Sequence, residues 1–246
     1  MRFPRMDQDE ALSALMDMFA KKKTAGVCFP DMSTMVLTMK DGGFKRLLQK
    51  RMRVFNDGAG LAWAARRRGR PFPANLNGTD LCPRFLAALP KGTSVYLIGG
   101  QEGLARRARD TLQGRFGHLD FVGAHHGYLD DREEALVLDE LRGIKPRVVL
   151  VGMGNPIQVE FIDRHLDDPG LEGTMFLAVG GLLNYWAGDL RRAPAWIRKS
   201  RLEWLYIVMQ QPAKTRRYLF GIPRFLLGCL RADQRAEHDL PSGRGP

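Results

Sequence analysis

Short apolar runs alternate along the chain with longer stretches in which apolar residues recur every three or four positions. This alternation is typical of β-α units that build a mainly parallel sheet flanked by helices. It predicts strands at 25–29, 53–55, 94–98, 119–122, 147–151 and 174–179. Helices are predicted at 9–22, 44–50, 60–68, 80–88, 103–115, 132–142 and 156–165. The expected fold is therefore α/β and Rossmann-like.

The last quarter of the chain has a different pattern. Residues 191–246 hold twelve Lys or Arg and four Asp or Glu, so they carry most of the formal net charge of +11. Cations alternate there with aromatic and aliphatic residues at helical spacing. We expect residues 1–190 to form the α/β domain and 191–246 a basic helical appendage, whose polar end at 232–246 frays.

Two interpretations of this appendage stay open. Its mixture of cations and apolar residues suits the surface of an anionic bilayer. The same pattern fits a C-terminal helix that packs on the core and leaves its arginines exposed. The charge requires only an anionic partner, and a nucleic-acid-binding module is disfavoured because the segment shows no recognised binding motif.

Composition narrows the class of protein. The chain has no run of about 18 apolar residues, and its N-terminus lacks the continuous apolar stretch of a secretory signal. Its three cysteines are too few and too scattered for a disulfide framework or a zinc site. We therefore expect a cytoplasmic protein with reduced thiols.

Glycines follow several of the predicted strands, as Gly99-Gly100, Gly152-Met153-Gly154 and Gly180-Gly181. Ligands of an open α/β sheet lie outside the carboxyl ends of the strands, so these turns line the expected site unless they are plain tight turns. The backbone N–H groups of 152–157 could cradle a phosphate. Ile157 stands where a dinucleotide fingerprint requires glycine, which disfavours a nicotinamide enzyme.

Asp57 follows a strand and precedes a helix, so it could act as a general base or be an N-cap or turn residue. His125 and His126 suggest a metal site, but adjacent residues on a strand point to opposite faces and no further ligands complete a set. We interpret His126-Gly127-Tyr128 as a turn with one buried ring.

Several of these motifs occur together in one order along the chain. They are Asp57 to Ala65, Gly78 to Leu81, Leu97 to Gly100, His126 to Tyr128, Val151 to Glu160, Gly188 with Arg192 to Pro194, and Glu203 to Tyr206. In this order and spacing the chain resembles the WecG/TagA/CpsF glycosyltransferases, glycosyltransferase family 26. The resemblance covers roughly residues 27–230.

The resemblance implies a metal-independent, inverting enzyme without a cofactor, bound peripherally to the inner face of a bacterial cell membrane. Its donor would be a UDP-sugar carrying a hexose or N-acetylhexosamine. Its acceptor would be a saccharide on undecaprenyl diphosphate, in exopolysaccharide or teichoic-acid-like synthesis. Whether it forms a homo-oligomer is left open.

The resemblance also assigns roles to residues. Asp57 corresponds to the general base and Gln158 to an amide that positions substrate. The expected substrate-binding residues are Asp31, Asn75, Gly99, Gly100, Gly152, Gly154, Gly180, Gly181, Asn184, Lys214 and Arg217.

Five positions depart from the family pattern. Phe29 and Asp31 replace a threonine and an asparagine, Asn75 and Ile207 each replace an arginine, and Asn184 replaces an aspartate. Two alternatives therefore remain: an active, divergent enzyme, or a catalytically degenerate relative that binds nucleotide-sugar or membrane within a polysaccharide assembly complex.

Overall fold

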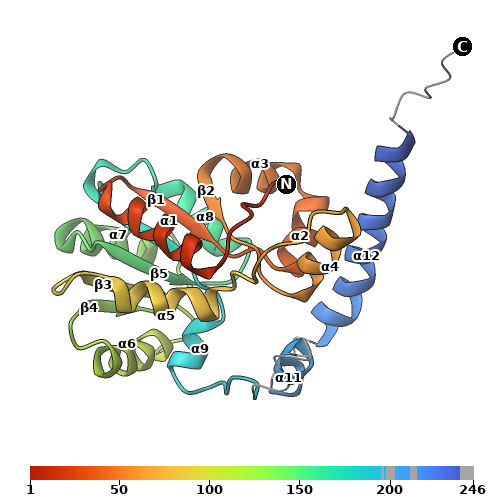
Figure 1. The fold of residues 1–246 in the computed structure, drawn as a ribbon. Helices are drawn as coiled ribbons and strands as arrows, with labels where there is room; N and C mark the ends of the chain where they lie inside the picture. The colour runs from red at the N-terminus through yellow and green to blue at the C-terminus, as the bar shows by residue number, and fades with distance from the viewer. Residues whose placement is uncertain (195–196, 198–202, 211–214, 239–246) are drawn as a thin grey trace, which may run out of the picture.

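The computed structural model has one six-stranded sheet flanked by helices, which confirms the predicted fold class (Figure 1). It describes residues 1–194, 197, 203–210 and 215–238. The strands are β1 (Ala25–Cys28), β2 (Met52–Val54), β3 (Ser94–Gly99), β4 (Asp120–His125), β5 (Val148–Gly152) and β6 (Met175–Ala178). Their order is β2-β1-β6-β5-β3-β4, and every neighbouring pair is parallel.

Both faces of the sheet are covered. Along β3, Val95 and Leu97 pack in one core cluster, whereas Tyr96 and Ile98 pack in the other. Buried residues of α1 (Gln8–Ala20), α5 (Gly78–Ala88), α6 (Leu104–Arg115) and α9 (Leu182–Trp186) join the first cluster. Those of α3 (Gly42–Arg51), α7 (Asp131–Ile144) and α8 (Ile157–His165) join the second, together with Leu171 of the short helix η1 (Pro169–Leu171). Burial on two faces explains why the central strands are continuous apolar runs.

The apolar pattern did not predict α2 (Met32–Lys40) or α9. The α2 segment mixes Met and Leu, which favour helix, with Ser, Thr and Val, which favour it less, so its composition gives no clear signal. Its start is fixed by Asp31, whose Oδ1 accepts the Thr34 N–H at 2.8 Å in an N-cap. Packing against the C-terminal helix supports α2 along its length.

The basic appendage contains α11 (Glu203–Gln210) and α12 (Thr215–His238). Phe225 and Cys229 of α12 are buried beside Leu61 of α4 (Ala59–Arg67), so one face of α12 packs on the body of the protein. The helix extends to His238, and the expectation that the polar end frays from residue 232 stays a prediction. Residues 239–246 lie outside the described part, and the division at residue 190 stays a prediction.

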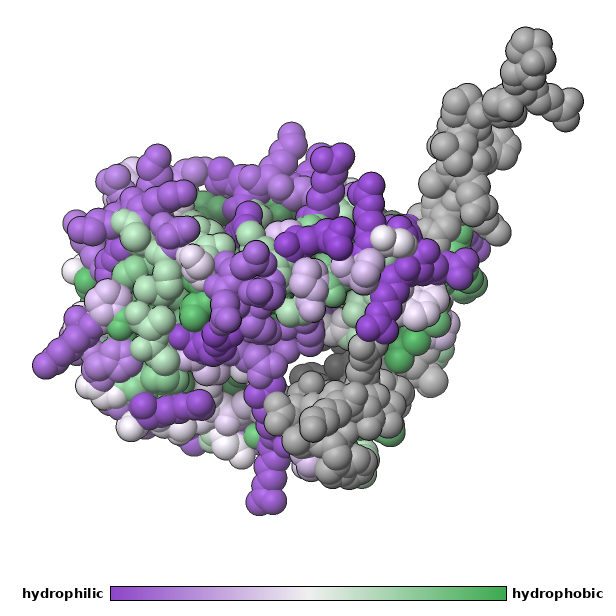
Figure 2. Space-filling model, in the orientation of Figure 1, coloured by the Kyte–Doolittle hydropathy of each residue, from purple (hydrophilic) through white to green (hydrophobic). Residues whose placement is uncertain are grey.

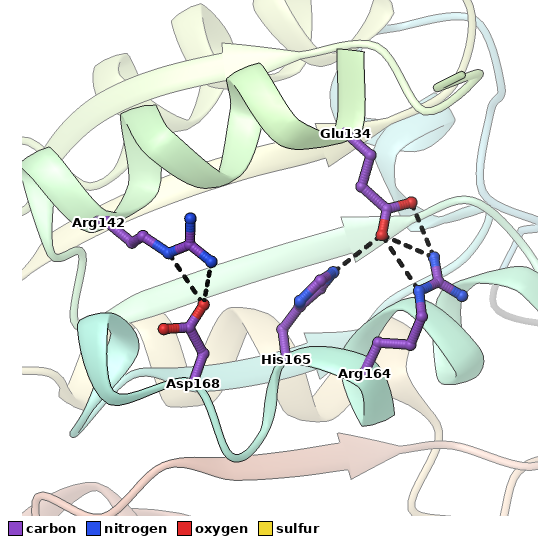
Figure 3. A network of polar contacts seen from close by, with 5 residues as sticks. All are labelled: Glu134, Arg142, Arg164, His165 and Asp168. Carbon is purple, nitrogen blue, oxygen red and sulfur yellow. Dashed lines mark hydrogen bonds and ion pairs between the residues drawn. The ribbon is translucent and has the colours of Figure 1, made fainter. Parts of the chain in front are cut away.

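Ion pairs join the outer helices α7 and α8 (Figure 3). Glu134 accepts hydrogen bonds from Arg164 at 2.8 Å and from His165 Nε2 at 3.0 Å. Burial alone would raise the pKa of Glu134, but these two donors lower it overall. Burial lowers the pKa of His165 and outweighs the opposing effect of Glu134. Both groups therefore bind protons less readily in the folded than in the unfolded protein.

We predict that the free energy of unfolding falls on acidification. The unfolded chain takes up protons first at His165, near the ordinary histidine pKa of about 6.5, and then at Glu134, near about 4.3. Their contribution is therefore complete above about pH 6.5 and is lost as the pH falls through the lowered native values. Urea unfolding of His165→Gln should show a shallower pH dependence between about pH 7 and 5.

Asp139→Asn is the matched control, because Asp139 is an exposed partner of Arg142 on the same helix. An unchanged slope in His165→Gln would contradict this account of the ion-pair cluster.

Candidate active site

The turns predicted to line the site gather at one edge of the sheet. Because every strand is parallel, the segments after β1, β2, β3, β5 and β6 all leave from the carboxyl edge. These segments contain Asp31, Asp57, Gly100, Gly154 and Gly180. The structure therefore brings residues from five separate parts of the sequence to one edge of the sheet.

A crevice is expected between β3 and β5. The chain leaves β3 through α6 toward β4 on one side, and leaves β5 through α8 toward β6 on the other. The two connections lie on opposite faces, because the buried residues of α6 belong to one core cluster and those of α8 to the other. Such a topological switch point is where open α/β sheets bind their ligands.

Glycines allow the backbones to meet at this crevice. The Gly100 N–H donates to the Gly152 carbonyl at 3.2 Å, and the Gly127 N–H donates to the Gly100 carbonyl at 2.8 Å. A Cβ on Gly99 would lie 2.6 Å from the backbone of Gly152, and Gly99 has a φ of +153°. A side chain at Gly99 would push the β3 and β5 turns apart.

Two of the predicted phosphate-binding glycines use their N–H groups internally. Gly154 and Gly180 donate to Oε1 of Gln158 at 3.2 and 3.0 Å. The expected cradle of free N–H groups over 152–157 is therefore wrong at Gly154. A Cβ on Gly154 would meet nothing within 4 Å, whereas one on Gly180 would lie 3.7 Å from the Gln158 amide.

Gln158 belongs to a chain of side-chain hydrogen bonds. Its Nε2 donates to Asn155 Oδ1 at 2.9 Å, Asn155 Nδ2 donates to Thr34 Oγ1 at 2.8 Å, and Thr34 Oγ1 donates to Asp31 Oδ1 at 2.7 Å. Gln158 is only 3% exposed. The amide therefore lies in the floor of the site, and its contact with substrate stays a prediction. Sequence reasoning missed Thr34 and did not assign a role to Asn155.

Asp57 lies half-buried, three residues after β2 ends at Val54. Its N–H donates to the Pro30 carbonyl at 3.1 Å, which ties the β2 turn to the β1 turn. Gly58, rather than Asp57, is the N-cap residue of α4, so the N-cap alternative for this carboxylate is wrong. Burial, and then the charge of Asp57, raises the pKa of the Cys82 thiol, so the carboxylate acts electrostatically on the core next to the site.

Two further predicted residues hold backbone turns. Asn75 accepts the Gly58 N–H through Oδ1 at 2.8 Å, and so it supports the turn that carries Asp57. Asn184 lies in α9, where its Nδ2 makes a long contact of 3.4 Å with the Gly181 carbonyl. Their roles toward substrate stay predictions.

His125 and His126 were expected to point to opposite faces of a strand, but their rings lie next to each other. Their ring centroids lie 4.3 Å apart, because His126 comes after the end of β4. His126 is largely covered and Tyr128 is exposed, in agreement with a turn that buries one ring. No group of three or more His, Cys, Asp or Glu side chains that could hold a metal occurs within the described residues.

A pocket of about 620 Å³ lies between α5 and α9. Three guanidinium groups line it, those of Arg84, Arg115 and Arg192, and Arg192 forms an ion pair with Asp80. Sequence reasoning named Arg192 only as part of a motif. Of the predicted cations, Lys214 and the side chain of Arg217 lie outside the described part of the structure.

Comparisons with known proteins agree with the resemblance. The model of the "Glycosyl transferase WecG/TagA/CpsF family" matches residues 1–239. Two similar proteins from Staphylococcus aureus, strains MW2 and NCTC 8325, are named N-acetylglucosaminyldiphosphoundecaprenol N-acetyl-beta-D-mannosaminyltransferase. Each is 31% identical over 193 residues, which cover 78% of this chain and 74% of the relative.

We predict that Gly152→Ala disturbs the crevice. The new Cβ would lie 2.5 Å from Leu183 and 2.9 Å from the Gly180 carbonyl, so the β5 and β6 turns must separate. Urea unfolding should show a loss of about 1–3 kcal/mol. Gly143→Ala in α7 is the control, since a Cβ there meets nothing within 4 Å and alanine favours helix. Equal stability of the two variants would rule out the close packing described here.

Proposed function

The chain belongs to the glycosyl transferase WecG/TagA/CpsF family and is a glycosyltransferase, and from this premise we propose its reaction in detail. It transfers a hexose or N-acetylhexosamine from a UDP-sugar to a saccharide linked to undecaprenyl diphosphate. The names of the two staphylococcal relatives support such an acceptor. The observation that carries the proposal is the position of Asp57 at the same sheet edge as the glycine turns that follow β3 and β5.

In the proposed reaction Asp57 acts as general base. Its carboxylate takes the proton from an acceptor hydroxyl while the hydroxyl oxygen bonds to the anomeric carbon of the donor. The bond from that carbon to the phosphate oxygen breaks on the opposite face, and UDP leaves with the electron pair. One displacement of this kind inverts the anomeric centre.

We place the donor and acceptor on two sides of Asp57. The donor nucleotide suits the crevice at Gly99, Gly100 and Gly152, because open α/β sheets bind ligands at the switch point. The pocket between α5 and α9 suits the acceptor, because its guanidinium groups match an anionic diphosphate. The turn that carries Asp57 and the N-terminus of α5 are linked through Asn75, which precedes α5 closely in sequence.

The departing UDP gains negative charge as its bond to the sugar breaks. Oriented donors and fixed cations stabilise such charge, and removal of one donor typically costs about 3 kcal/mol of barrier. We assign this role to Lys214 and Arg217, which the resemblance places on the appendage. No metal ion is part of the proposed reaction.

We predict that Asp57→Asn lowers the rate of UDP release in the presence of lipid-linked acceptor by about 10²- to 10⁴-fold, the usual contribution of a general base. Protection of the variant against thermal unfolding by the donor should persist, because the donor lies in the crevice. Asp189→Asn, which removes an exposed partner of Arg107, should keep wild-type activity.

A panel of UDP-sugars in the same thermal assay identifies the donor, since a ligand at 100 times its Kd adds about 2.7 kcal/mol of stability. Full activity of Asp57→Asn would refute the proposed base. A wild-type protein that binds a UDP-sugar but never releases UDP would instead establish the degenerate relative.

The outer face of α12 supports attachment to an anionic membrane. Phe220 and Leu227 are 50% and 52% exposed, and the exposed Arg224 and Arg231 fall on the same side of the helix at 3.6 residues per turn. Figure 2 shows hydrophobic and hydrophilic side chains close together at the surface below the grey C-terminal end. Cations that flank exposed apolar residues suit anionic head groups. None of the helices in the described residues has the length and hydrophobicity to cross a bilayer.

We predict that the protein floats with vesicles containing anionic phospholipid and does so less as salt is raised. Phe220→Glu with Leu227→Glu should reduce flotation at least several-fold, because it adds negative charge and removes apolar contact. Leu136→Glu on α7, also exposed, is the matched control. Equal flotation of both variants would exclude this face as the membrane contact.

A further inference from the structure

The polar chain from Gln158 to Asp31 links three elements that are distant in sequence. Gln158 belongs to α8, Asn155 to the turn after β5, and Thr34 to α2. Thr34 and Gln158 are 1% and 3% exposed, and Asp31 and Asn155 are half-buried, so water has limited access to these hydrogen bonds. This hydrogen-bond chain therefore couples the β1 and β5 turns through side chains that are at least half-buried.

Each side chain in this series of hydrogen bonds donates in the direction of Asp31. An ionised carboxylate only accepts hydrogen bonds, so the Thr34 hydroxyl must donate to Asp31. Thr34 Oγ1 is then the acceptor for Asn155 Nδ2, which turns Asn155 Oδ1 toward Gln158. The carboxylate at one end thus fixes the orientation of two amides.

At the other end of this hydrogen-bond series, Gln158 binds the turns that follow β5 and β6. With its Nε2 committed to Asn155, Gln158 directs Oε1 toward the N–H groups of Gly154 and Gly180. A flipped amide would set its NH₂ group against both donors. The Gln158 oxygen therefore joins the β5 and β6 turns, in addition to the backbone hydrogen bonds that Val179 and Gly180 donate to the Val151 carbonyl.

We propose that Thr34 and Asn155 are positioning residues of the transfer reaction. They contact neither substrate; they fix Gln158 and, through it, the two turns beside the crevice. Rigid placement matters because a misplacement of about 1 Å can lower a rate by about 100-fold. This inference rests on the proposed function and adds to it the means by which the floor of the site is kept in place.

Thr34→Val tests the proposal, because it keeps the shape of the side chain and removes the hydroxyl. Thr38→Val is the matched control: Thr38 is also buried on α2, but its hydroxyl bonds only to the Met35 carbonyl of the same helix. We expect kcat of Thr34→Val to fall about 10- to 100-fold, with Kd for UDP changed less than threefold. Thermal stability should fall about equally in the two variants, and Thr34→Ser should restore kcat to within about threefold of wild type.

Asn155→Ala should lower kcat by a similar factor, and adding Thr34→Val to it should cost little more, because either change breaks the same chain. The proposal is overturned if Thr34→Val and Thr38→Val have equal kcat, if serine fails to restore kcat, or if the two changes multiply fully. A wild-type protein without turnover would overturn the proposed function and this role together. An active wild type with an unaffected Thr34→Val would overturn the positioning role alone.

Discussion

The parallel pairing of Gly99 with Gly152 at the ends of β3 and β5 is the contact on which the site depends. Strands of one sheet approach within about 5 Å, and side chains at their ends normally fill the space above. Here both positions lack a side chain, and the backbones are so close that a Cβ on Gly99 would lie 2.6 Å from Gly152. The chain leaves these strands in opposite directions, and the turns at Gly100, Gly127 and Gly152 are joined by backbone hydrogen bonds. The glycines thus allow close backbone packing at a topological switch point, the place where open α/β sheets bind ligands.

The hydrogen bonds around Gln158 offset the free-energy cost of ordering the glycine-rich turns. Turns rich in glycine have much conformational freedom to lose, and buried N–H groups need partners. Gln158 supplies one oxygen for two such groups, and Asn155, Thr34 and Asp31 fix that oxygen in turn. The result is a rigid support made from side chains rather than from additional strands. Buried hydrogen-bond networks of this kind specify one geometry when every member has a partner.

The sequence predicted the sheet better than the floor of the site. Apolar runs such as Val148–Gly152 are buried on both faces and stand out against polar turns, so all six strands were located. By contrast, α2 packs against α12, nearly 190 residues away, and its mixture of Met and Leu with Ser, Thr and Val gives no clear helical signal. Asp31 was expected to bind substrate, yet its N-cap role and its bond to Thr34 depend on that helix. The partnership of Thr34 with Asn155 spans 121 residues, and no local pattern reveals it.

The departures from the family pattern near Asp57 are accommodated by packing. Phe29 stacks on Phe55 with ring centroids 5.9 Å apart, and a Cβ on Gly78 would lie 3.1 Å from the Phe29 ring. The aromatic ring thus fills the space between the strand ends and the start of α5, where a threonine would leave a cavity. Asn75, in place of an arginine, accepts the Gly58 N–H and secures the next residue after Asp57. Asn75 supports the turn that carries Asp57 and Phe29 packs between β2 and α5, so both substitutions are compatible with an ordered site.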